Sequence, residues 1–194
     1  VLGVWFARWR SLIDVLVRVS SAIPAIVFAL LPLGLIQRFG SIELSMVGFV
    51  VVLSLTGWAE ASVRVRLATE QLRRQPFVEA AYALGLRDGA VLWRHILPNL
   101  RDILLIEATY ATAAVLLLIA ELGFLGVYIA GAEIEGIGNT VTVDPVFAEW
   151  GSMLARGVRD EPRGWWLLLV PAGAFVFAIL AFNLLAEGLR RRDR

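Results

Sequence analysis

The sequence contains no cysteine, no lysine and a single histidine, His95. Without cysteine the chain cannot form a disulfide, a thiolate zinc site or an iron–sulfur cluster. Without lysine it lacks the residue that a phosphate-binding P-loop and a Schiff-base enzyme both require. One histidine is too few for a zinc protease motif, which places two on one helix. We therefore expect no catalytic residue, no metal site and no cofactor bound by this chain.

Charged residues are also scarce, at 18% of the chain, whereas hydrophobic residues make up 59%. An ordinary soluble domain has about 45 to 50% apolar residues. The hydrophobic residues form blocks with few or no charges at 19–36, 44–59, 103–132 and 164–186. A membrane-spanning helix needs about 20 such residues. The blocks predict an all-α bundle that crosses the lipid bilayer at least four times, with helices over about 13–36, 42–72, 99–122 and 164–189.

The arginines indicate how these helices are oriented. Fourteen of the eighteen lie before the first block, between the second and third, or after the fourth. Because arginine accumulates on the cytoplasmic side of a membrane, we expect the middle connection and the C-terminus in the cytoplasm. The segment 126–163 is then external. Since the arginines have this explanation, nucleic-acid binding is not expected.

Residues 1–7 are apolar and run directly into Arg8 and Arg10. We interpret them as the last turns of a further helix. Residues 1–194 are then expected to be a single transmembrane domain that is truncated at its N-terminus. Pro24, Pro32 and Pro171 lie inside predicted spans, where each removes a backbone donor and is expected to bend its helix. Such a bend serves either packing or gating.

The cytoplasmic connection contains two short predicted helices within residues 76–98. Pro76 suits a first helical turn, Gly85 can adopt the left-handed conformation that ends the first helix, and Asp88 can cap the second. Phe77, Ala80, Ala81 and Leu84 recur at helical spacing and predict one apolar face. This face either enters a groove of a partner protein or packs on its own bundle.

The same connection resembles a known family. Its matching residues are Glu79, Ala80 and Ala81, then Gly85 after three residues, then His95, Leu97 and Pro98 after nine more. They resemble the EAA loop in the transmembrane subunits of binding-protein-dependent ABC importers. A histidine followed by Ile-Leu-Pro-Asn is similar to the dipeptide, oligopeptide and nickel branch. Residues 124–126, 149–154 and 181–190 also resemble segments of that branch.

The resemblance implies a permease in a bacterial or archaeal plasma (inner) membrane, lacking here the family's first helix and most of its second. With a related but different permease it would form the path for dipeptides or oligopeptides. Two ATPase subunits would use ATP in the cytoplasm, and a solute-binding protein would dock outside. Glu79 would bind an ATPase, Ala80 and Ala81 would allow close approach, and Gly85 would set the angle of the loop. Residues 130–144 are longer and richer in glycine than this family leads us to expect.

Several alternatives stay open. The solute could instead be nickel or another small molecule, and the classes of membrane scaffold and intramembrane enzyme are weaker rivals. His95 could make a structural hydrogen bond, relay a proton or bind a metal. Glu107 could line the translocation path or pair with an arginine, because a lone charge in a span is costly. Trp150 could contact the binding protein or anchor the chain at the membrane surface.

Overall fold

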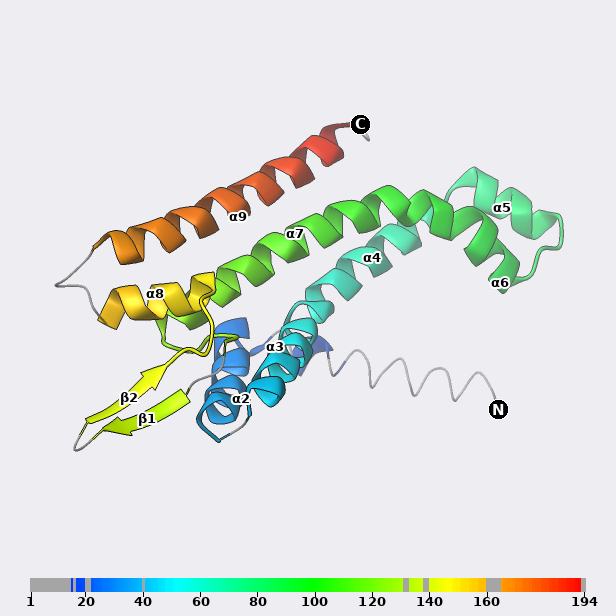
Figure 1. The fold of residues 1–194 in the computed structure, drawn as a ribbon. Helices are drawn as coiled ribbons and strands as arrows, with labels where there is room; N and C mark the ends of the chain where they lie inside the picture. Colours follow the sequence, from blue (N-terminus) through cyan, green and yellow to red (C-terminus); the bar gives the residue numbers. More distant parts are fainter. Residues whose placement is uncertain are drawn as a thin grey trace.

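The structure is a computed structural model. It describes residues 15, 17–19, 22–39, 41–130, 133–137, 140–159 and 165–192. The apolar segment 1–7 and residues 160–163 of the predicted external segment lie outside the described residues. Within the described part the chain is mainly helical, with one β-hairpin (Figure 1). The elements are α2 (Ala25–Phe39), α3 (Ile42–Thr56), α4 (Trp58–Arg73), α5 (Pro76–Ala83), α6 (Asp88–Val91), the π-helical turn η1 (Leu92–Ile96), α7 (Leu97–Phe124), β1 (Glu133–Ile137), β2 (Thr140–Asp144), α8 (Trp150–Arg159) and α9 (Trp166–Arg192).

Three helical stretches are long and apolar enough to cross a membrane, at Ile42–Arg73, Asp88–Phe124 and Trp165–Arg191. They correspond to the second, third and fourth predicted spans. Large apolar side chains on these stretches are exposed, for example Leu117, Phe177 and Leu184. Exposure of such residues is expected where a helix faces lipid rather than water. The predicted helical membrane bundle is thereby confirmed.

The first predicted span differs from the expectation, because it is interrupted at Pro24. The N–H groups of Val27 and Phe28 donate to the Pro24 carbonyl at 3.0 and 3.1 Å, so α2 begins directly after this residue. Proline lacks an N–H and disfavours a helical conformation at the residue before it, here Ile23. The 15 residues of α2 extend about 22 Å at 1.5 Å per residue, less than a bilayer core. Pro32 and Pro171, by contrast, lie inside continuous helices.

The second span is also divided, at Gly57, which ends α3 and begins α4. No proline causes this interruption. The φ and ψ angles of Gly57 are −91° and −8°, and the N–H of Ala61 reaches its carbonyl at 3.4 Å, a long hydrogen bond. Glycine weakens a helix because it loses more conformational freedom than other residues. The sequence analysis predicted one uninterrupted helix over 42–72 and missed this break.

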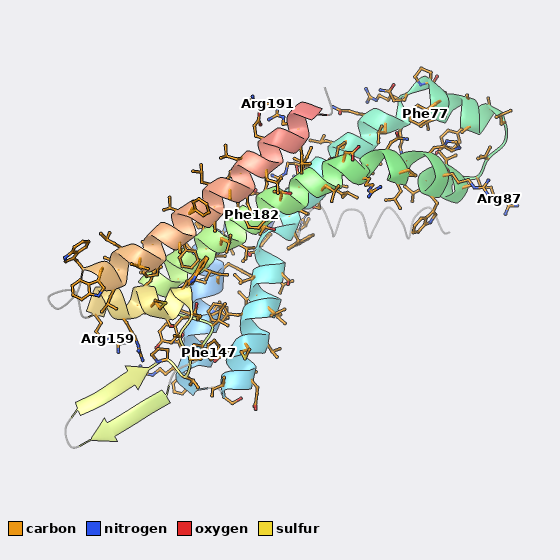
Figure 2. All side chains as sticks on the ribbon, turned by 45° about the horizontal axis from the view of Figure 1, so that its top comes forward. Phe77, Arg87, Phe147, Arg159, Phe182 and Arg191 are labelled. Atoms are coloured by element: carbon orange, nitrogen blue, oxygen red, sulfur yellow. The ribbon has the colours of Figure 1, made fainter. Side chains whose placement is uncertain are left out.

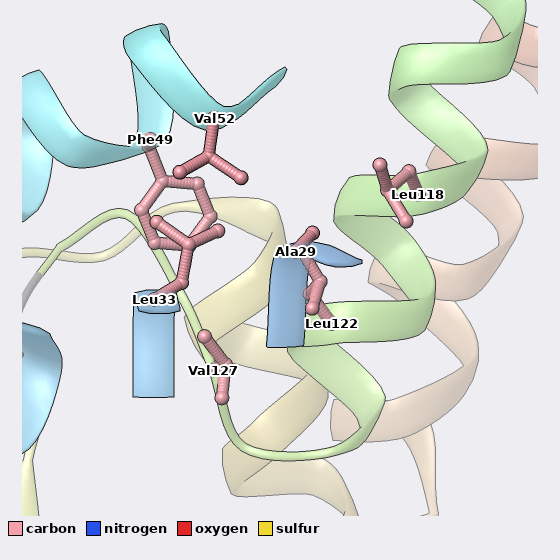
Figure 3. Packing of buried hydrophobic residues seen from close by; sticks show 7 residues of the cluster. All are labelled: Ala29, Leu33, Phe49, Val52, Leu118, Leu122 and Val127. Atoms are coloured by element: carbon pink, nitrogen blue, oxygen red, sulfur yellow. The ribbon is translucent and has the colours of Figure 1, made fainter. Parts of the chain in front are cut away.

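A hydrophobic core joins α2, α3 and the C-terminal end of α7 (Figure 3). Leu33 and Phe49 are almost fully buried and belong to one cluster with Leu122 at the end of α7 and Val127 just after it. The remaining members of this core are Ala29, Val52 and Leu118. The core fixes α2 and α3 against the last turns of α7.

A polar contact reinforces this core at the same end. The side-chain amide of Gln37 on α2 donates to the Gly126 carbonyl at 3.0 Å, and its oxygen accepts from the Tyr128 N–H at 2.9 Å. Gly126 has φ +82°, and the Val127 N–H donates to the Leu122 carbonyl at 2.8 Å, as in a Schellman motif. Gln37 thus fixes the backbone of the segment that follows α7.

The predicted external segment, 126–163, contains structure that the sequence analysis did not predict. Strands β1 and β2 form an antiparallel hairpin in which Glu133 pairs with Asp144 and Ile137 with Thr140. Helix α8 follows and packs against both α7 and α9. At Gly157 a Cβ atom would stand 2.7 Å from backbone atoms of Leu168, so α8 lies unusually close to α9. The hairpin and α8 occupy the end of the molecule opposite α5 and α6 (Figure 1).

Candidate functional site

The connection predicted to couple the bundle to a partner forms helix α5, the short helix α6 and the π-helical turn η1. It projects from one end of the structure, and Figure 2 places Phe77 and Arg87 far from Phe147 and Arg159 at the other end. Pro76 is at the first helical positions of α5, as predicted, and Gln75 is its N-cap residue. Glu79 lies in the first turn with an exposed side chain. A carboxylate there is favoured by the helix dipole.

One side of α5 packs on the chain itself. Val78 is fully buried and Ala81 is 4% exposed. They form a small core with Val91, Ile96 and Leu100, and this core also receives Ala68, Leu72, Leu86 and Ile103. The contributing residues come from α4, α5, α6, η1, α7 and the turn after α5, so the loop is packed on the ends of the two helices that it connects.

The other side of α5 is exposed and apolar. Phe77 is 41% exposed, Leu84 is 81% exposed, and Ala80 lies between them. The predicted face of four residues is therefore divided, because Ala81 turns inward to the loop's own core. One edge of the face therefore packs on the bundle, and entry of the exposed remainder into a partner's groove stays a prediction. The expectation that Ala81 offers close approach to a partner is not supported by its burial.

Gly85 ends α5 with φ +80°, the left-handed conformation predicted for it. The Leu86 N–H donates to the Ala81 carbonyl at 3.2 Å and the Gly85 N–H to the Tyr82 carbonyl at 2.9 Å. These two hydrogen bonds define a Schellman motif. Leu86 then packs against the core that contains Ala81. Gly85 thus sets the direction in which the chain leaves α5.

Asp88 does not cap α6 as predicted. It is the first residue of the helix, and Arg87 occupies the N-cap position without a side-chain cap. The carboxylate nevertheless lies in the first turn, where a negative charge is favourable. The prediction placed the helix start one residue too late.

His95, Leu97 and Pro98 lie where η1 passes into α7. The Leu97 N–H donates to the carbonyl of Leu92, five residues earlier, which widens this turn. Pro98 has no N–H to donate and its ring crowds the preceding turn, so a wider turn accommodates it. The Asn99 side chain donates to the His95 backbone carbonyl at 2.6 Å. These residues therefore shape the continuous helix Asp88–Phe124 that joins the loop to the span.

Glu107 on α7 is paired with an arginine, one of the two alternatives that the sequence left open. Arg64 Nε on α4 lies 2.5 Å from a Glu107 carboxylate oxygen, and the Glu107 side chain is 14% exposed. Arg64 also reaches Glu60, one turn earlier, at 3.5 Å. In the described part of the chain no group of three or more histidine, aspartate and glutamate side chains could hold a metal ion.

Trp150 begins α8 at the opposite end and is 45% exposed. Its ring meets Phe175 of α9 edge-to-face, with ring centroids 5.4 Å apart. The preceding Glu149 caps the helix, since its carboxylate accepts from the N–H groups of Gly151 and Ser152 at 2.6 and 2.9 Å. The Ser152 hydroxyl in turn accepts from the Glu149 N–H at 3.0 Å. Sequence analysis missed this reciprocal cap, although a Glu-x-x-Ser spacing before a helix could have indicated it.

The sequence from residue 1 to residue 192 matches the family described as "Binding-protein-dependent transport system inner membrane component". The chain belongs to this family. The resemblance of the EAA loop is thereby confirmed at the level of the family, whose members are inner membrane components of transport systems. The geometry described above is therefore that of a loop in an inner membrane component of a transport system.

Relatives within this family carry the names of peptide permeases. A protein of Brucella suis biovar 1, named as a peptide transport system permease, is 32% identical over 190 residues, which cover 98% of this chain and 58% of the relative. A protein of Brucella ovis, named as a peptide permease, is 35% identical over 186 residues, covering 94% and 55%. The oligopeptide transport system permease protein OppC of Salmonella typhimurium is 29% identical over 175 residues, covering 90% and 51%. The chain spans little more than half the length of these relatives.

Proposed function

We propose that this chain is part of the permease subunit of an ABC importer and that it forms, with a second related permease, a membrane path for dipeptides and oligopeptides. The names of the relatives in Brucella and Salmonella support peptides as the solute. The three long apolar helical stretches support a path through the membrane. ATP hydrolysis belongs to separate ATPase subunits, and this chain supplies coupling rather than chemistry.

The observation that carries this proposal is the division of α5 into two faces. Val78 and Ala81 attach the helix to the ends of α4 and α7, whereas Phe77, Ala80 and Leu84 present an exposed apolar face. An amphipathic helix with such a face suits a groove in another protein. The ATPase occupies this place in our proposal. Force applied to the exposed apolar face of α5 would reach α4 and α7 through the core that contains Val78 and Ala81.

Glu79 adds a polar contact to this interface. Its carboxylate is exposed in the first turn of α5, next to the outer face. We assign it a charge-assisted hydrogen bond to the ATPase, of a kind that contributes about 1.5 to 3 kcal/mol when well formed. Ala80 then permits close approach of the two backbones. Ala81 contributes from the inner side by anchoring the helix.

The remaining assignments concern orientation and the outer partner. The C-terminal end of α9 runs towards the end of the molecule that carries α5 (Figure 1). This arrangement and the arginine distribution both support a cytoplasmic C-terminus in a bacterial or archaeal plasma membrane. Trp150, half exposed beside the hairpin end, is then external and available to a solute-binding protein.

Uptake by cells tests the choice of solute. The full-length permease, its partner permease, ATPases and binding protein are expressed in a strain without its own peptide and nickel importers. We expect labelled dipeptides or oligopeptides to accumulate, and the uptake to stop when the ATPases are inactivated. Accumulation of nickel without peptides would select the alternative solute. Uptake of neither by an assembled complex would contradict both.

A further inference from the structure

A hollow of about 140 Å³ lies between the beginning of α2 and the junction of α3 with α4. Pro24 and Phe28 line it on the α2 side, and Thr56, Ala59 and Glu60 line it on the other. This space is large enough for several water molecules. Both helix interruptions in this part of the chain, at Pro24 and Gly57, lie beside it.

The hollow lies at the end of the second apolar block, whose last residue, Ala59, lines it. Helices α2 and α3 each have 15 residues; α2 ends at Phe39 and α3 begins at Ile42, at the end where Gln37 contacts Gly126. The hollow is at their other ends, about 22 Å away at 1.5 Å per residue. A bilayer core is about 30 Å thick. Interrupted helices within that depth are tolerated where they are buried in protein or line a water-filled cavity.

Near the hollow, two carboxylates contact the same arginine. Arg64 lies 2.5 Å from Glu107 and 3.5 Å from Glu60, so its closer contact is with Glu107. Among the described residues, two carboxylates share one guanidinium here, so Glu60, Arg64 and Glu107 together carry one excess negative charge. The Glu60 side chain is 74% exposed, whereas that of Glu107 is 14% exposed. The excess charge is therefore most accessible at Glu60, on the wall of the hollow.

Glu60 requires a polar environment. Glu60 directly follows the apolar block 44–59, and a charge that faces lipid costs up to about 2.5 to 3.5 kcal/mol, the value at the centre of a membrane-spanning helix. The hollow offers the carboxylate water instead. Thr56 adds a second polar group, because its hydroxyl donates to the Leu53 carbonyl at 2.8 Å and keeps its oxygen as an acceptor. A carboxylate and a hydroxyl oxygen side by side suit a ligand that carries several N–H donors and a positive charge.

We propose that this hollow binds an ammonium group of the solute on its way through the membrane, with Glu60 supplying the charge and Thr56 an accepting oxygen. Under the proposed function, on which this identification rests, the group is the protonated amino terminus of a peptide. Arg64 then has a positioning role, because it neutralises Glu107 and leaves Glu60 as the accessible carboxylate.

The test uses the absence of cysteine from the chain. In an assembled full-length complex whose other cysteines have been replaced, Thr56→Cys introduces a single thiol on the wall of the hollow, and Ala25→Cys introduces one on the α2 side. Each thiol is exposed to cationic methanethiosulfonate ethylammonium and to anionic methanethiosulfonate ethylsulfonate, and the modified peptide is quantified by mass spectrometry. Rates are normalised to those of a free thiol in solution.

We expect modification from water at both positions, with the cationic reagent preferred by roughly tenfold, as in a cleft of one charge sign. Adding Glu60→Gln should abolish the preference but not the modification. Phe177→Cys, on the exposed apolar face of α9, is the control and should stay unmodified because it faces lipid. Unreactive thiols at both positions, or a cationic preference that survives Glu60→Gln, would overturn the proposal.

The ligand is tested by protection. A dipeptide with a free amino terminus should slow modification of the Ala25→Cys thiol, which leaves Glu60 and Thr56 in place, and its N-acetylated form should not. Equal protection by both forms, or none by either, would overturn the ammonium assignment. The uptake experiment separates the two proposals. Peptide uptake without a preference for the cationic reagent refutes only the proposed ammonium site. A preference for the cationic reagent without peptide uptake refutes only peptides as the solute.

Discussion

Gly123 on α7 lies directly against Gly151 on α8. A Cβ atom at Gly123 would stand 2.6 Å from the Gly151 Cα and 2.8 Å from its carbonyl oxygen. Both contacts are with backbone atoms, which cannot rotate away as a flexible side chain can. The close approach seats α8 against the outer end of α7.

The Gly123→Ala variant should therefore be destabilised. Forcing one methyl group into this contact separates the helices and costs about 1 to 3 kcal/mol. The measurement is the thermal unfolding midpoint of the purified complex in detergent. Gly173→Ala on α9 is the control, because a Cβ there meets nothing within 4 Å. Equal midpoints for the two variants would contradict the close contact.

Ser152→Ala tests the reciprocal cap of α8. The Ser152 side chain is buried, and its hydroxyl exchanges hydrogen bonds with the backbone of Glu149 at 2.9 and 3.0 Å. Loss of a cap costs about 0.5 to 2 kcal/mol, so the same midpoint should fall. Ser54→Ala removes only an exposed hydroxyl that donates to Val50 within its helix. A midpoint unchanged by Ser152→Ala would show that the cap is dispensable.

Gly85→Val tests the turn of the EAA loop. A β-branched residue at φ +80° is an outlier conformation, so the Schellman motif that directs the chain out of α5 would be lost. We expect peptide uptake to fall at least about tenfold, the equivalent of 1.4 kcal/mol, while the protein remains in the membrane. Gly89→Val, in α6 at an ordinary φ with open space around it, should retain uptake. Normal uptake by Gly85→Val would remove the turn from the coupling mechanism.

Exchange of charges tests the ion pair between α4 and α7. Arg64→Glu or Glu107→Arg alone places two like charges where the structure has opposite ones 2.5 Å apart. Each should lower stability by about 1.5 to 3 kcal/mol, the range for hydrogen bonds to charged groups. The double variant restores opposite charges and should recover at least half of that loss. No recovery in the double variant would show that the two residues act independently.

The features that the sequence predicted well depend on local signals. Apolar blocks of sufficient length predicted the spans over 42–72, 99–122 and 164–189, because a bilayer imposes that length directly. Gly85 was predicted to adopt positive φ because glycine between two short amphipathic helices has few other roles. Helix punctuation at Pro76 and Gly85 predicted two short helices in this connection, and α5 and α6 are present there.

The features that it missed depend on contacts between distant segments. Helical spacing identified Phe77, Ala81 and Leu84 as one apolar face, but only the packing of α4 and α7 decides that Ala81 turns inward. The partner of Glu107 lies 43 residues away on another helix, so spacing alone could not select Arg64. The hairpin of β1 and β2 depends on pairing between strands, such as Ile137 with Thr140, which no residue within one strand indicates by itself.

The central claim, that the outer face of α5 is the ATPase contact, is tested most directly by co-purification. The full-length protein is captured with its candidate ATPase as wild type, as Glu79→Arg, and as Glu43→Arg, which reverses an exposed charge on α3 at the opposite end of the molecule. We expect wild type and Glu43→Arg to retain the ATPase and Glu79→Arg to lose most of it. Equal capture by Glu79→Arg, or no capture by wild type, would contradict the account.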